Sequence, residues 1–157
     1  MSLFLLMHSN ESNICAKLKK VINFVGSLVE WYRPVTLAEL IELRHRYTGK
    51  ASKLVFGNTR VYIERKQDEV VYPRLISLAY IDELKQLENT KHSSILGAGV
   101  TLTRLQSVLT LWKHEMTDIA SSICQALLDQ LEHFASTQIR NVASIGGNII
   151  NPLSMYG

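Results

Sequence analysis

The spacing of apolar residues changes twice along this chain of 157 residues, and that change most limits how the chain can fold. Between residues 54 and 78 the apolar residues come in short continuous runs, which suit strands buried on both faces of a parallel sheet. Before and after that region they recur every three or four residues, as on one face of an amphipathic helix. The pattern therefore predicts helices near both ends of the chain and strands between them.

Four helices are predicted from this spacing. The clearest begins at Thr36, because Thr36 and Glu39 have the spacing of a capping box, in which each side chain accepts a hydrogen bond from the other residue's backbone amide. We expect this helix to reach Tyr47 and to be ended by Gly49. The other three helices are expected over residues 14–25, from Thr101 onward, and from Thr117 to Ala135.

The helix expected from Thr117 to Ala135 should bury an apolar face. Cys124 lies on that face, and we interpret it as a core residue rather than a nucleophile. The apolar residues that this helix carries are Ile119, Ile123, Ala126, Leu127, Leu131 and Phe134.

Four strands are expected, over residues 54–56, 60–64, 70–78 and 95–96. The first two flank Gly57 and Asn58, so a hairpin turn is one interpretation of this loop. The alternative is a binding loop, because successive backbone N–H groups at such a turn form a concavity that takes an anion. Gly57 allows a positive φ and a close approach to the backbone. The spacing alone leaves both interpretations open.

A second glycine-containing run, ASIGGNII over residues 143–150, offers the same chemistry. Ser144 carries a hydroxyl, Gly146 and Gly147 would let a ligand approach the backbone, and Asn148 can both donate and accept. A strand-entry turn with a bulge would also account for the two glycines. Neither run has the G-x-G-x-x-G spacing of a Rossmann domain.

Composition and spacing exclude several functional classes. The 17 basic residues are spread along the chain rather than gathered in a stripe, so nucleic-acid binding is not expected. No stretch reaches about 18 consecutive apolar residues, and no membrane span is expected. The histidines are scattered, and the two distant cysteines, Cys15 and Cys124, cannot form a metal or iron–sulfur site by themselves. We therefore expect no catalytic residue and no metal ligand in this chain.

Together, the two glycine runs and the GAGVTL segment at residues 97–102 resemble the FAD-binding domain of the molybdenum hydroxylases, the family of xanthine dehydrogenase and aldehyde oxidase. The likeness runs from about Val29 to Ile150 and includes WYRPVTLAELIELR and YPRLISLAYIDELKQLE. It implies an α+β fold of the PCMH type, with the first α+β subdomain and the beginning of the second. Residues 29–157 would form this domain, and residues 1–28 would form a tail with a short helix.

The resemblance also implies FAD as the cofactor and assigns contacts to it. The segment 53–60 would wrap the pyrophosphate, Phe134 would lie near the flavin, and the SxGGN element would contact the phosphate and ribitol. Arg60 stands where the family commonly has an acidic residue, and Tyr62 where it has a small one. The implied cofactor contacts are Lys53, Leu54, Val55, Phe56, Gly57, Asn58, Thr59, Arg60, Phe134, Ser144, Gly146, Gly147 and Asn148.

In functional terms, the resemblance implies the FAD-binding, electron-transfer portion of an oxidoreductase, without iron–sulfur and molybdopterin domains, and located in the cytosol. Its expected partners are other domains or chains of a molybdenum hydroxylase. The segment INPLSMYG departs from the family pattern. An alternative is therefore a truncated, non-catalytic remnant or interaction module that binds FAD weakly or not at all and self-associates through exposed apolar surface. A complete oxidase is disfavoured, because no candidate base lies near either glycine run.

Overall fold

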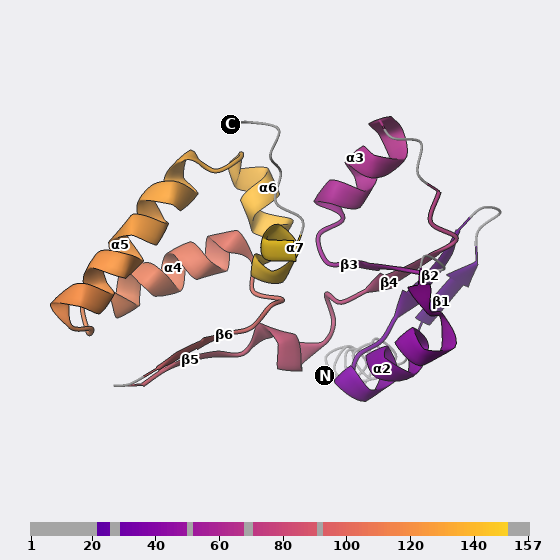
Figure 1. Ribbon diagram of the computed structural model, residues 1–157, viewed down its shortest axis with the longest axis horizontal. Coiled ribbons are helices and arrows are strands. Elements are labelled where there is room, and N and C mark those ends of the chain that lie inside the picture. The colour runs from indigo at the N-terminus through magenta and orange to yellow at the C-terminus, as the bar shows by residue number, and fades with distance from the viewer. Residues whose placement is uncertain (1–21, 26–28, 50–51, 68–70, 91–92, 151–157) are drawn as a thin grey trace, which may run out of the picture.

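The computed structural model describes residues 22–25, 29–49, 52–67, 71–90 and 93–150, and its elements form two lobes (Figure 1). The first lobe contains β1 (Ile22–Val25), β2 (Glu30–Arg33), α2 (Leu37–Arg46), β3 (Lys53–Val55), α3 (Thr59–Gln67) and β4 (Arg74–Ser77). The second lobe contains β5 (Leu87–Asn89), β6 (Ser94–Leu96), α4 (Leu102–Trp112), α5 (Asp118–His133), α6 (Thr137–Val142) and α7 (Ile145–Ile150). The 3-10 helix η2 (Asp82–Lys85) lies between them in the chain.

The first lobe is built on a four-stranded sheet in the order β1-β2-β4-β3. The β1 and β2 strands are antiparallel, whereas β4 is parallel to both β2 and β3, so that Ile76 pairs with Tyr32 on one side and Leu54 on the other. The parallel pairing expected around residue 54 is confirmed. Burial on both faces is not, because β3 is an edge strand of the described sheet and 40% of Leu54 is exposed.

The strand predicted over residues 60–64 is wrong, and so is the hairpin interpretation of the preceding loop. Residues Arg60 to Glu64 belong to the helix α3. The physical reason is the parallel pairing of β3 with β4, which requires the chain to cross back over the sheet between them, usually through a helix. The side chains of Val61 and Glu64 are buried at the helical spacing of three.

The helix predicted over residues 14–25 is wrong at its end, since Ile22–Val25 form the strand β1, which pairs with β2. The rest of that prediction lies outside the described residues. Strand pairing has overridden the local helical periodicity here. The elements β2, β5, α6 and α7 and the 3-10 helix were not expected from the sequence.

The capping-box helix is confirmed as α2. Thr36 accepts a hydrogen bond from the backbone amide of Glu39 at 3.2 Å, and Glu39 accepts one from the amide of Thr36 at 3.3 Å. Gly49 follows with a φ of 64°, in the left-handed region that favours glycine. The helices expected from Thr101 and Thr117 are also confirmed, as α4 and α5.

Two helices cover opposite faces of the sheet. Leu40 and Leu43 of α2 pack with Ile76, whereas Val61 of α3 packs with Leu75. Because successive residues of a strand point to opposite faces, the neighbours Leu75 and Ile76 belong to separate apolar clusters. Ile76 is fully buried at the centre of the sheet.

The second lobe has its own core, in which α4 packs against α5. Leu105, Val108 and Leu109 of α4 meet Cys124 and Leu131 of α5. The prediction that Cys124 is a core residue is therefore confirmed.

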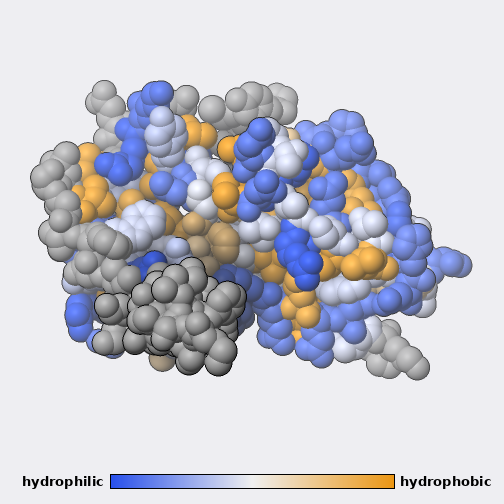
Figure 2. Space-filling view, turned by 180° about the vertical axis from the view of Figure 1, so that it is seen from behind, coloured by the Kyte–Doolittle hydropathy of each residue, from blue (hydrophilic) through white to orange (hydrophobic). Residues whose placement is uncertain are grey.

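Part of the apolar face expected on α5 is exposed instead of buried. The exposed fractions are 78% for Ile119, 58% for Ile123 and 42% for Leu127, and Ala126 is also exposed. In the view from behind, hydrophobic patches interrupt the hydrophilic surface of the second lobe (Figure 2). Within the described part of the chain, α4 is the helix that packs most closely on α5, and Ile119, Ile123 and Leu127 are exposed.

Replacing the buried Ile76 with alanine tests the core of the first lobe. We expect Ile76→Ala to lower the free energy of unfolding by about 2–5 kcal/mol, because it leaves a cavity between the sheet and α2. Urea unfolding followed by circular dichroism would measure the change. Ile41→Ala on the exposed side of α2 is the matched control and should stay within about 0.5 kcal/mol of wild type. Equal costs for the two variants would contradict this description of the core.

Candidate functional site

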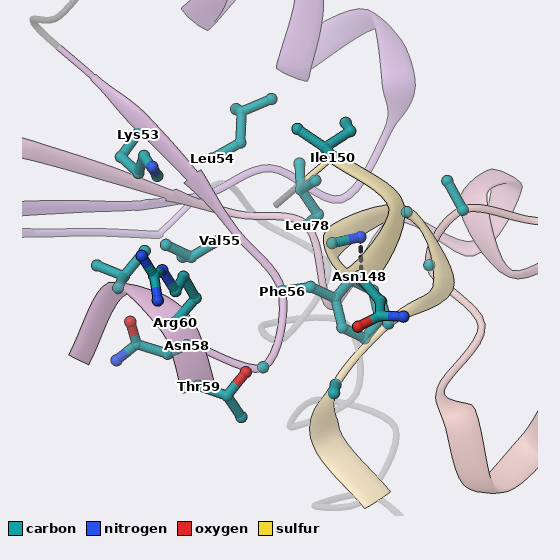
Figure 3. Close-up of a pocket in the computed structure, with 18 of the residues that line it drawn as sticks. Lys53, Leu54, Val55, Phe56, Asn58, Thr59, Arg60, Leu78, Asn148 and Ile150 are labelled. Atoms are coloured by element: carbon teal, nitrogen blue, oxygen red, sulfur yellow. Dashed lines mark hydrogen bonds between the residues drawn. The ribbon is translucent and has the colours of Figure 1, made fainter. Parts of the chain in front are cut away.

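A cavity of about 440 Å³ lies between the two lobes. This volume is within the range of about 300–1,000 Å³ that is usual for ligand pockets. Figure 3 shows the residues of β3 and its following loop on one side and Asn148 and Ile150 of α7 on the other. The cavity therefore joins parts of the chain that are about ninety residues apart.

Every residue for which the sequence implied a cofactor contact lines this cavity, from Lys53 to Arg60 in the first lobe and Phe134 to Asn148 in the second. Sequence reasoning missed part of the lining. Ala98 and Gly99 lie within the GAGVTL segment, so that motif could have pointed to them. The other missed residues carry no local signal and are Arg44, Ser52, Val61, Leu78, Leu84, Ile139, Ala143 and Ile150.

The first glycine element connects β3 directly to the N-terminus of α3. Asn58 has a φ of 57°, so it is Asn58 rather than Gly57 that takes the left-handed conformation. Within the described part of the chain, the backbone N–H groups of residues 57–60 have no protein acceptor. The first four N–H groups of a helix lack intrahelical partners and lie at its positive end. This turn can therefore donate hydrogen bonds to an anion in the cavity.

The second glycine element is the first turn of the helix α7, so its interpretation as a strand-entry turn is wrong. Its backbone N–H groups already have acceptors within the protein. Gly146 donates to the carbonyl of Ala98 at 2.8 Å, and Gly147 donates to the hydroxyl of Ser144 at 3.1 Å. Asn148 donates to the carbonyl of Ser144 at 3.0 Å. The amides of this element are thus occupied, and it forms a wall of the cavity rather than an anion-binding turn.

Close contacts within the protein leave no room for a side chain at Gly57 or Gly99. A side chain at Gly57 would place its Cβ 2.0 Å from the carbonyl oxygen of Val142, at the end of α6. A side chain at Gly99 would place its Cβ 2.8 Å from the ring of Phe56. The loop after β3 therefore lies directly against the second lobe, and both glycines permit that approach.

The charged residues that line the cavity are all basic. They are Arg44, Lys53 and Arg60, and the described lining contains no aspartate or glutamate. Arg44 donates to the hydroxyl of Ser52 at 2.8 Å. A cavity with this charge favours an anionic ligand.

A buried carboxylate, Glu64, lies behind two of these cations. It forms ion pairs with Lys53 at 3.2 Å and with Arg60 at 3.3 Å. Burial opposes the charged form of Lys53, but hydrogen bonds to Glu64 and Tyr72 outweigh it, and the pKa of Lys53 is raised. The ammonium is therefore charged at neutral pH.

Phe134 is held at the C-terminus of α5 by a neighbouring arginine. Arg140 donates to the backbone carbonyls of Phe134 and Ala135, both at 2.7 Å. These carbonyls have no helical partner at a helix end, and a cation there satisfies them. Phe134 is in this way fixed at the rim where α5 turns into α6.

The described residues contain no group of three His, Cys, Asp or Glu side chains that could hold a metal ion. Within the same residues, every helix is too short or too polar to cross a membrane.

Comparison with known proteins identifies a matching family. Residues 25–154 match the model of the FAD binding domain in molybdopterin dehydrogenase. The chain is 39% identical over 140 residues to the xanthine dehydrogenase/oxidase of Gallus gallus, a match that covers 88% of this chain and 10% of that protein. It is 41% identical over 133 residues to aldehyde oxidase 3 of Mus musculus, which covers 85% of this chain and 10% of that protein. The chain thus spans about a tenth of the length of these relatives.

Solved structures of low sequence identity share the fold. A carbon monoxide dehydrogenase from Hydrogenophaga pseudoflava matches with a TM-score of 0.62 and 23% identity, over 80% of this chain and 40% of that chain. Quinoline 2-oxidoreductase from Pseudomonas putida 86 matches with a TM-score of 0.61 and 19% identity, over 83% of this chain and 40% of that chain.

The contact between the lobes can be tested at its glycine. We expect Gly57→Ala to lower the free energy of unfolding by about 1–3 kcal/mol, because the new methyl group overlaps the backbone of Val142. Gly147→Ala is the matched control. Its methyl group meets only the hydroxyl of Ser144, and the helical preference for alanine over glycine, about 0.5–1 kcal/mol, offsets that contact. A Gly57→Ala variant as stable as wild type in urea unfolding would show that the lobes do not meet here.

Proposed function

The chain belongs to the family of the FAD binding domain in molybdopterin dehydrogenase, and we propose that it is the FAD-holding, electron-transfer portion of an oxidoreductase similar to xanthine dehydrogenase and aldehyde oxidase. The observation that carries this proposal is the cavity between the lobes. It combines unoccupied amide donors at the start of α3 with a lining whose charged residues are all basic. That is the environment that a pyrophosphate requires.

The residues present fit a dinucleotide of this kind. The amides of residues 57–60 would hold a phosphate at the positive end of α3, where charge-assisted hydrogen bonds to an anion are strong. Arg44 and Lys53 would hold the neighbouring phosphate charge. Asn148 offers a side-chain amide that can both donate to and accept from a hydroxyl-rich linker such as ribitol.

Apolar residues would hold the ring systems of the cofactor. Leu54, Leu78 and Ile150 line the cavity beside the polar turn, and Phe134 adds an aromatic ring at its rim. Such residues exclude water and give flat rings a surface on which to stack. FAD, when bound, would supply a carrier that accepts and gives up electrons.

The larger protein context is also part of the proposal. Since the chain spans about a tenth of its relatives, we propose that other domains or chains of a molybdenum hydroxylase supply the substrate chemistry and deliver the electrons. We place the assembly in the cytosol, as the family resemblance implies. Within that assembly, the basic lining of the cavity supports a role for this chain in binding the cofactor and fixing its orientation.

A second candidate function is an interaction module with little or no FAD binding. The observation that favours it is the apolar stripe of Ile119, Ile123 and Leu127 on the surface of α5. Exposed apolar surface of this kind commonly mediates association with another protein surface. A titration with FAD separates the two functions.

A fluorescence titration of the full chain with FAD tests the proposal. We expect saturable quenching, and we expect Arg44→Gln to weaken binding about tenfold, or about 1.4 kcal/mol, because one cation of the lining is lost. Arg46→Gln is the control, since it removes the same charge from an exposed position on the same helix. It should change affinity less than about twofold, because an exposed charge contributes little. Absence of quenching in wild type would favour the interaction module.

A further inference from the structure

Glu64 is a buried carboxylate of the first lobe, and neither the cavity lining nor the family comparison explains why it is there. It belongs to α3, and only 7% of the residue is exposed. Its carboxylate lies outside the lining of the cavity. Burying a carboxylate is unfavourable unless charged and hydrogen-bonding partners compensate it, so its partners indicate what it does.

The partners of Glu64 include two cations that do line the cavity. Lys53 of β3 and Arg60 of α3 lie 3.2 Å and 3.3 Å from its oxygens. Tyr72, just before β4, donates its hydroxyl to the same carboxylate at 2.6 Å. Figure 3 shows Lys53 and Arg60 beside the same strand, β3. One carboxylate thus connects the cavity wall to the body of the lobe.

Both cations keep donors available while they are paired. Arg60 uses its Nε atom for Glu64, and within the described residues its two terminal nitrogens have no protein acceptor. Besides its 3.2 Å ion pair with Oε2 of Glu64, Lys53 donates to Oε1 of Glu64 at 3.5 Å and to the hydroxyl of Tyr72 at 3.4 Å. These bonds are long, and an ammonium has three protons. The pairing therefore orients the two side chains without using up their capacity to bind an anion.

The charges also match a pyrophosphate. Lys53 and Arg60 share one carboxylate, so this cluster keeps one net positive charge, and Arg44 adds another at the same cavity. A pyrophosphate diester carries one negative charge on each phosphate. A ligand of this class would neutralise the cavity.

We propose that Glu64 is a positioning residue, which holds the Lys53 ammonium and the Arg60 guanidinium at the wall between β3 and α3 so that they meet the two phosphates of FAD. This inference rests on the proposed function. Long lysine and arginine side chains lose rotamer freedom when they bind a ligand. Glu64 imposes that order before the ligand arrives, which strengthens binding through preorganisation.

The test is the sign of the effect of Glu64→Gln on FAD affinity. The substitution removes a negative charge beside an anion site, so electrostatics alone would make FAD bind more tightly. If Glu64 positions the cations, FAD should instead bind about tenfold more weakly, although the cavity has become more positive. Fluorescence titration at low and at physiological salt measures both the sign and its screening.

Two further variants keep the test decisive. Glu64→Asp retains the charge but shortens the side chain by one methylene group, so it should also weaken FAD binding, and it replaces Glu64→Gln if that variant does not fold. Tyr72→Phe removes the hydrogen bond to the same carboxylate and the longer one from Lys53 at 3.4 Å, but it keeps both ion pairs that hold the cations. It should lower the stability of the fold while changing FAD affinity less than about twofold.

A second readout does not depend on FAD. In Glu64→Gln the pKa of the Lys53 ammonium, measured by NMR, should fall, because burial then opposes its charge without the carboxylate. Unchanged or tighter FAD binding by both Glu64 variants, with wild type binding normally, would overturn this inference alone. Failure of wild type to bind FAD would overturn the proposed function and this inference with it.

Discussion

The close approach of two backbones at Gly57 is the contact on which the rest of the site depends. The loop after β3 lies so near the end of α6 that a single methyl group at Gly57 would overlap the carbonyl of Val142. Phe56 and Gly99 meet in a similar way a few residues away. These contacts hold the edge of the sheet in the first lobe opposite α7 in the second, and the cavity lies between them.

The two glycine elements have different tasks although their sequences look alike. The turn before α3 keeps its amide donors available to the cavity, whereas the amides that open α7 are occupied by Ser144 and the GAGVTL segment. The difference arises from where the two helices begin. The α7 helix begins against residues 98–100, which supply carbonyl acceptors, while α3 begins at the rim of the cavity. The first element can therefore bind an anion, and the second forms a wall of the cavity.

The positive charge of the cavity comes from basic residues, two of which are paired with a buried carboxylate. Arg60, Lys53 and Arg44 together make the lining basic. Glu64 balances part of that charge from a buried position. The ion pairs of Glu64 join β3 to α3, and the hydrogen bond from Tyr72 adds the segment before β4. The charge of the cavity therefore depends on the packing of α3 against the sheet.

The sequence by itself determined the features that depend on neighbours within one or two helical turns. The capping box of α2, the helices α4 and α5, the core position of Cys124 and the places of both glycine elements could be read from local spacing. Tertiary structure decided the features that depend on segments far apart in the sequence. Parallel pairing of β3 with β4 made residues 59–67 a helix rather than a strand, and pairing with β2 made residues 22–25 a strand. Packing within the first lobe placed Arg44 at the cavity, beside Ser52, and placed Glu64 behind the cavity lining. Such contacts join residues whose separation in sequence carries no periodic signal.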